Sequence, residues 1–157
     1  MTRIGVTGHQ DIPAQALPLI TDGIRAFLAE LPAPADGYSS LAGGADQLFA
    51  RILLDSGGRL HAVIPASNYE TTFEGDALRQ YLRLLREAVS VEELPFDAPS
   101  EGAYDAAGHC VVDHSDILLA VWDGEPARGQ GGTADAVNYA RAQHLPVHII
   151  WPAGVSR

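Results

Sequence analysis

The apolar residues of this chain switch repeatedly between two spacings, and this alternation constrains the fold more than any other feature. Short apolar runs predict strands at residues 3–7, 38–42, 60–64, 89–91, 116–122 and 147–151. Between them, apolar residues recur every three or four positions, which predicts helices within residues 17–31, 45–53, 78–85, 103–114 and 136–140. Strands that are apolar on both faces and separated by helices indicate a doubly wound, mainly parallel α/β sheet with helices on both faces.

Length and composition favour one domain that spans residues 1–157. A chain of 157 residues with 46% hydrophobic content is long enough to bury one core, and we find no linker that would divide it. No apolar run is long enough for a membrane-spanning helix, and the first residues do not resemble a signal sequence. We therefore expect a soluble, cytoplasmic protein without a membrane partner.

The charged residues narrow the possible chemistry. The formal net charge is −10, and all ten basic residues are arginines. From this charge we expect no long nucleic acid as a partner. Without lysine the chain cannot form a Schiff base or use a Walker-type lysine. A bound phosphate would have to be held by backbone amides, helix N-termini, hydroxyls or single arginines.

Glycine-rich loops follow several predicted strands, at the edge where open parallel sheets bind ligands. Glycine lets a ligand approach the backbone closely, and the amides at the start of the next helix attract an anion. The residues that we predict to bind a ligand are Gly8, His9, Gln10, Gly43, Gly44, Asp46, Tyr69, Asp123, Gly124, Arg128, Gly129, Gly131, Gly132 and Thr133.

The segment from Arg128 to Thr133 gives the strongest indication of a phosphate site. It combines three glycines, a hydroxyl and an arginine between a buried strand and a helix. Thr133 could cap the helix and contact a phosphate oxygen, and Arg128 could supply positive charge. The alternative is a flexible turn with an ordinary helix cap.

Other residues at this edge leave a structural and a functional interpretation open. Asp46 either stabilises a helix N-terminus or contacts a ribose hydroxyl. Asp123 either stabilises a turn or belongs to the site, and His9 either binds backbone or acts on a ligand. Tyr69 and Phe73 either stack on a base or cover the core.

One group of residues has a spacing that suggests metal ligands, namely His109, Cys110, Asp113 and His114. Cys110 falls on the apolar face of the predicted helix, and His109 lies about 100° away around the axis. No second cluster completes a coordination sphere, and a single cysteine cannot make a multi-cysteine zinc site. We therefore predict no metal and no cofactor.

Three segments together resemble the SLOG superfamily, which includes the Lonely Guy phosphoribohydrolases and the Rossmann domain of DNA-processing protein A. They are residues 5–9 (GVTGH), 41–46 (LAGGAD) and 115–124 (SDILLAVWDG) continuing to Gly131-Gly132-Thr133. The resemblance covers about residues 3 to 150. It implies a Rossmann-like sheet that binds a nucleotide or a nucleotide derivative, often in a homodimer.

The sequence departs from the Lonely Guy pattern at one catalytic position. When the chain is aligned on Thr133, Ala136 stands where that pattern has a glutamate, and Asp135 is one residue early. The nucleophilic glutamate of the similar nucleoside deoxyribosyltransferases also falls on Ala136. We therefore predict a protein that binds a small nucleotide. The alternatives are a nucleotide N-glycosidase using Asp46, Asp123 or Asp135, or a carrier of a phosphorylated cofactor such as a molybdopterin.

Overall fold

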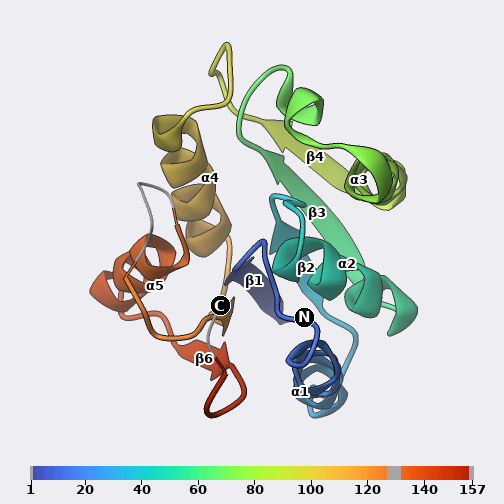
Figure 1. Ribbon diagram of the computed structural model, residues 1–157, viewed down its shortest axis with the longest axis vertical. Helices are drawn as coiled ribbons and strands as arrows, with labels where there is room; N and C mark the ends of the chain where they lie inside the picture. Colours follow the sequence, from blue (N-terminus) through green and yellow to red (C-terminus); the bar gives the residue numbers. More distant parts are fainter. Residues whose placement is uncertain (1, 127–131, 156–157) are drawn as a thin grey trace.

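Six parallel strands form one sheet in the computed structural model, which describes residues 2–126 and 132–155. The strands follow the order β4-β3-β2-β1-β5-β6 across the sheet (Figure 1). They are β1 Arg3–Gly8, β2 Asp36–Ser39, β3 Arg59–Ile64, β4 Ser90–Glu93, β5 Ile117–Val121 and β6 Val147–Ile150. The helices are α1 Leu17–Ala29, α2 Ala45–Asp55, α3 Gly75–Glu87, α4 Glu101–Asp113 and α5 Thr133–Ala142, with a short 3-10 helix at Tyr69–Thr72.

Helices cover both faces of the sheet. In Figure 1, α4 and α5 lie on one side of the strands, and α1, α2 and α3 lie on the other. The chain leaves β1 toward β2, whereas it leaves β5 toward β6, and β1 and β5 are neighbours. Their carboxyl ends therefore form the topological switch point of the sheet, where open α/β folds leave a crevice for a ligand. The predicted fold class is confirmed.

The larger part of the core lies between the sheet and helices α1, α2 and α3. Phe49, Leu53, Ile20 and Ile24 are fully buried there, and their spacing explains why these segments are helical. A smaller cluster on the other face brings Leu118 and Ala120 of β5 against Val112, Val137 and Ala140.

Strand β2 differs from the prediction, because it ends at Ser39 rather than at residue 42. Leu41 adopts a left-handed backbone with φ of 58°, and its amide donates to Oγ of Ser39 at 3.0 Å. Strand β2 begins earlier than predicted, at Asp36, whose amide donates to the carbonyl of Thr2 at 2.9 Å and whose carboxylate accepts from Arg59 of β3 at 2.9 Å and 3.2 Å. Among the helices of the described ranges, none has the length and apolarity needed to cross a membrane.

Candidate functional site

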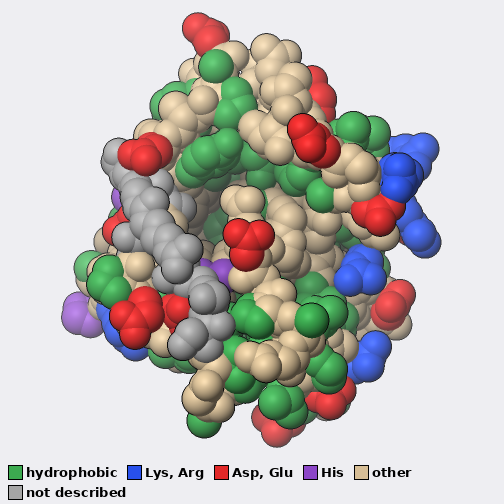
Figure 2. Space-filling view, viewed as in Figure 1, with side chains coloured by type: hydrophobic (Ala, Val, Ile, Leu, Met, Phe, Trp, Pro, Cys, Tyr) green, Lys and Arg blue, Asp and Glu red, His purple; other side chains and the backbone are tan. Residues whose placement is uncertain are grey.

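A cavity of about 770 Å³ opens at the carboxyl edge of the sheet, beside the switch point. The space-filling view shows the hollow facing the viewer, with apolar side chains on its upper wall (Figure 2). Its lining comes from the end of β1, the loops after β1, β2 and β3, helix α4 and the start of α5. Of the predicted ligand-binding residues, those that line it are Gly8, His9, Gln10, Gly43, Asp46, Tyr69, Gly132 and Thr133.

Two glycines allow the loop after β1 to lie directly against the N-terminus of α2. A Cβ at Gly8 would come 2.4 Å from Cβ of Ala45, and a Cβ at Gly44 would come 2.2 Å from the carbonyl oxygen of Gln10. Gly44 also has φ of +78°, which disfavours other residues. The amide of Ala45 donates to the carbonyl of His9 at 3.1 Å, so the chain itself uses the first amide of α2.

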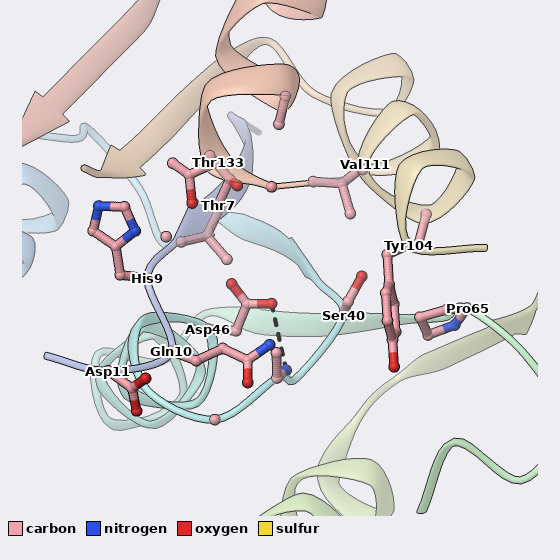
Figure 3. A pocket seen from close by; sticks show the side chains of 18 of the residues that line it. Thr7, His9, Gln10, Asp11, Ser40, Asp46, Pro65, Tyr104, Val111 and Thr133 are labelled. Atoms are coloured by element: carbon pink, nitrogen blue, oxygen red, sulfur yellow. Dashed lines mark hydrogen bonds between the residues drawn. The ribbon is translucent and has the colours of Figure 1, made fainter. Parts of the chain in front are cut away.

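Asp46 carries the most perturbed carboxyl group of the cavity. Its residue is 8% exposed, and one carboxylate oxygen accepts a long hydrogen bond of 3.4 Å from the amide of Ala42 (Figure 3). Burial raises the pKa of Asp46 from 3.8 to about 7, and the Ala42 amide offsets only part of this effect. Asp46 can therefore hold or release a proton near neutral pH.

His9 and Asp123 meet at the switch point, although 114 residues separate them in the chain. Nε2 of His9 lies 3.1 Å from Oδ1 of Asp123 and accepts from the Asp123 amide at 3.2 Å. The same carboxylate accepts from the amide of Glu125 at 3.0 Å, which closes a turn at Gly124. The His9 ring also lies edge-on to Trp151, with 5.4 Å between ring centroids. Neither Asp123 nor Gly124 lines the cavity.

The start of α5 forms one end of the cavity. Thr133 is the first residue of this helix and is 7% exposed, and the preceding Gly132, not Thr133, is its N-cap. Ala136 lines the cavity, whereas Asp135 does not. The predicted phosphate ligands Arg128, Gly129 and Gly131 lie outside the described residues.

Aromatic residues make the wall on the side of the 3-10 helix. Tyr69 and Phe73 both line the cavity, yet they are only 3% and 9% exposed. Tyr69 meets Phe73, Tyr81 and Tyr104 edge-on, and Phe73 stacks on Tyr81 with 4.5 Å between ring centroids. Burial, together with the nearby Asp46 carboxyl, raises the pKa of Tyr69 and keeps its hydroxyl neutral.

The sequence analysis did not predict that helix α4 lines the cavity, nor that the hydroxyl groups of Thr7 and Ser40 do. One wall of the cavity is a mostly small and apolar face of α4, formed by Tyr104, Ala107, Gly108 and Val111. In a sequence, such a pattern predicts residues that are buried in the core. In Figure 3, Thr7, Ser40, Asp46 and Thr133 come from four separate segments and surround one space. Hydroxyl and carboxyl groups that face one cavity are suited to orient a polar ligand.

The charge of the described lining is mostly negative. Besides Asp46, its acidic residues are Asp11, Glu74, Glu101 and Glu125, and within residues 2–126 and 132–155 no arginine lines the cavity. Carboxylates accept hydrogen bonds from sugar hydroxyls and amino groups but repel phosphate. The N-terminus of α5, where Gly132 and Thr133 line the cavity, carries the positive end of the helix dipole, and Asp135 lies in the same turn.

The strand order, the switch-point cavity and the glycine loops define a Rossmann-like α/β fold, and solved structures of other proteins share this fold. DNA processing protein A from Helicobacter pylori matches with a TM-score of 0.72 and 14% identity, over 99% of this chain and 68% of that chain. DNA processing protein A from Streptococcus pneumoniae matches with a TM-score of 0.70 and 19% identity, over 98% of this chain and 51% of that chain. The Moco carrier protein from Chlamydomonas rheinhardtii matches with a TM-score of 0.52 and 17% identity, over 94% of this chain and 74% of that chain. No family model and no curated protein matches the sequence.

The exclusion of long nucleic acid was wrong. The Helicobacter pylori protein has the same fold, and its structure describes a single-stranded DNA binding mode. Net charge sums over the whole chain, whereas a nucleic acid responds to local charge. Helix α3 carries Arg79, Arg83 and Arg86, and Figure 2 shows basic side chains gathered at the right of the molecule. The net charge of −10 therefore does not exclude this class of partner.

Proposed function

We propose that the protein binds a small nucleotide or a nucleotide-derived ligand in the cavity at the carboxyl edge of the sheet. The observation that carries this proposal is a 770 Å³ cavity at the switch point between β1 and β5. Ligand cavities in proteins usually measure about 300–1,000 Å³, so one nucleotide fits. The SLOG-type fold supports a nucleotide-related role in general terms.

A phosphate of this ligand binds at α5 rather than at α2. The first amide of α2 already donates to His9, and the Asp46 carboxyl occupies its first turn. At α5, Gly132 and Thr133 line the same cavity, and the aspartate of this first turn, Asp135, does not line it, whereas Asp46 does. The acidic residues elsewhere in the lining favour contacts with the ribose and the base, and they disfavour a ligand with several phosphates.

The second candidate function is hydrolysis of the N-glycosidic bond of a bound nucleotide. Asp46 favours it, because a carboxyl with a pKa of about 7 inside the cavity can act as a general acid or base. In this reaction water adds to the ribosyl carbon, the base leaves with the proton, and ribose phosphate remains. Asp123 and Asp135 do not line the cavity, so Asp46 is the carboxylate that we assign to this role.

Binding is tested by isothermal titration of the full chain with adenosine, AMP, ADP and the corresponding guanine and cytosine compounds. We expect a monophosphate to bind more tightly than its nucleoside. A Cβ at Gly43 meets nothing within 4 Å, so Gly43→Val adds bulk to the cavity without a clash in the fold. It should weaken binding at least tenfold. Gly102→Val is the matched control, because a Cβ at Gly102 makes only an ordinary contact, 3.9 Å from Oγ of Ser100, and Gly102 does not line the cavity.

If no compound binds, or if Gly43→Val binds as tightly as the parent chain, the proposal fails. The same samples are assayed for free base by chromatography. If the parent chain releases free base, and Asp46→Asn still binds the nucleotide but releases none, the glycosidase function is established. Binding without base release leaves a protein that only retains its ligand.

A further inference from the structure

A second group of chemically reactive side chains lies outside the cavity, between β4 and α4. It consists of Glu92 on β4, Cys110 on α4 and His114 at the end of α4, and none of the three lines the cavity. Sγ of Cys110 lies 3.3 Å from Oε2 of Glu92 and 3.7 Å from Nδ1 of His114. Within the parts of the chain that the structure describes, this is the one place where three such donor atoms approach within 4.8 Å of one another.

The two separations from Sγ of Cys110 match those of a metal coordination sphere, and the third pair of donor atoms lies within 4.8 Å. Zinc bonds of about 2.3 Å to sulfur and about 2.0–2.2 Å to nitrogen or oxygen, at a tetrahedral angle, separate the donor atoms by about 3.5 Å. The observed separations of 3.3 Å and 3.7 Å lie on either side of this value. A thiolate, an imidazole and a carboxylate are also donors that zinc accepts together.

We propose that Glu92, Cys110 and His114 bind a divalent metal ion of the zinc type, with water in the fourth position. Cys110 and His114 are four residues apart, so they share one face of the α4 end, and Glu92 reaches them from the neighbouring strand. Glu92 is exposed and the other two are half-buried, which leaves one side open to solvent. This site is independent of the proposed nucleotide cavity.

Neighbouring groups already orient the ligands. The Tyr38 ring stacks on His114 with 5.3 Å between centroids, and Cys110 packs against the cluster of Val63, Ala107 and Val111. Nδ1 of His114 also donates to the carbonyl of Cys110 at 2.8 Å; when Nδ1 binds the metal this hydrogen bond is lost and the ring carries its proton on Nε2. Binding releases the thiol proton to solvent and places one thiolate and one carboxylate against the two positive charges of the ion.

The spacing in the sequence revealed only two of the three ligands, Cys110 and His114. His109, a further member of that group, instead stacks on Tyr139 with 3.7 Å between centroids and lies 3.6 Å from Asp105. The third donor, Glu92, lies 18 residues before Cys110 on another element, and only the packing of α4 on the sheet brings it close.

Cobalt(II) titration of the full chain tests the proposal. Cys110 is the only cysteine of the chain, so a thiolate-to-cobalt charge-transfer band in the near ultraviolet reports this one residue. We expect the band to saturate at one cobalt per chain and to disappear when zinc is added. Cys110→Ser should abolish it, and Glu92→Gln and His114→Ala should each weaken cobalt binding at least about tenfold.

His109→Ala is the matched control, because it removes a histidine from the same helix that does not reach the site, and it should bind cobalt as the parent chain does. Glu92 is exposed, so Glu92→Gln tests the site without disturbing the core. Absence of the band at saturating cobalt overturns the proposal. So does a band that neither Glu92→Gln nor His114→Ala weakens.

Discussion

Replacement of Asp46 by Asn should change how the stability of this protein depends on pH. The buried carboxyl has a pKa of about 7 in the folded chain and about 3.8 when burial is lost on unfolding. The folded chain therefore binds the proton more tightly, and its free energy of unfolding falls as the pH rises from about 4 to about 7. Asn has nearly the same shape but cannot ionise, so Asp46→Asn removes this dependence.

The size of the effect follows from the two pKa values. At about 1.36 kcal/mol for each pH unit, the group costs the folded state about 4 kcal/mol once it is fully ionised. About 2 to 3 kcal/mol of this arises between pH 5 and pH 8, because part of the change occurs below pH 5. Asp46→Asn should therefore gain about 2 to 3 kcal/mol in unfolding free energy relative to the parent chain between these two pH values.

Urea unfolding followed by the fluorescence of Trp122 and Trp151, at pH 5 and at pH 8, measures this difference. Asp116→Asn is the control, because a hydrogen bond from the Arg3 side chain lowers the pKa of Asp116, which stays ionised throughout this range. Its difference from the parent chain should be the same at both pH values. An equally constant difference for Asp46→Asn would refute the raised pKa and the acid or base role built on it.

Two further predictions concern packing. Gly44→Ala should lower the free energy of unfolding by at least about 2 kcal/mol in urea denaturation, because its Cβ would lie 2.2 Å from the Gln10 carbonyl at a positive φ. Gly43→Ala should stay within about 0.5 kcal/mol of the parent chain, since no atom lies within 4 Å of that Cβ, and a loss as large as that of Gly44→Ala would contradict the loop geometry. Phe49→Ala should cost about 3–5 kcal/mol, because the ring is fully buried beneath the sheet, and a cost below 1 kcal/mol would show that the core is not packed around it.

Much of the fold could be predicted because the spacing of apolar residues within a short segment indicates whether it forms a helix or a strand. The apolar spacing around Ile20 and Ile24 is enough to predict α1, since a helix places residues three and four apart on one face. The end of β2 could not be predicted in this way. The sequence predicted that the strand continues through Leu41. In the structure the chain turns toward α2 there, with a left-handed backbone at Leu41.

The position of the site could be predicted from the same patterns, because every parallel strand sends its following loop to one edge. Gly8 and Gly43 were found by this rule, and both line the cavity. Tyr104 and Gly108 were not found, because side chains of a small, apolar helix face look the same whether they border a cavity or fill a core.

The sequence by itself determined the succession of strands and helices along the chain and the edge at which glycine loops gather, because these depend on residues a few positions apart. The tertiary structure alone decided that His9 meets Asp123, that Asp46 is buried enough to raise its pKa, and that Glu92 reaches Cys110. These contacts join strands and helices that are distant in the chain. Their distances and burial follow from the strand order and from how α2 and α4 pack on the sheet, which no local pattern encodes.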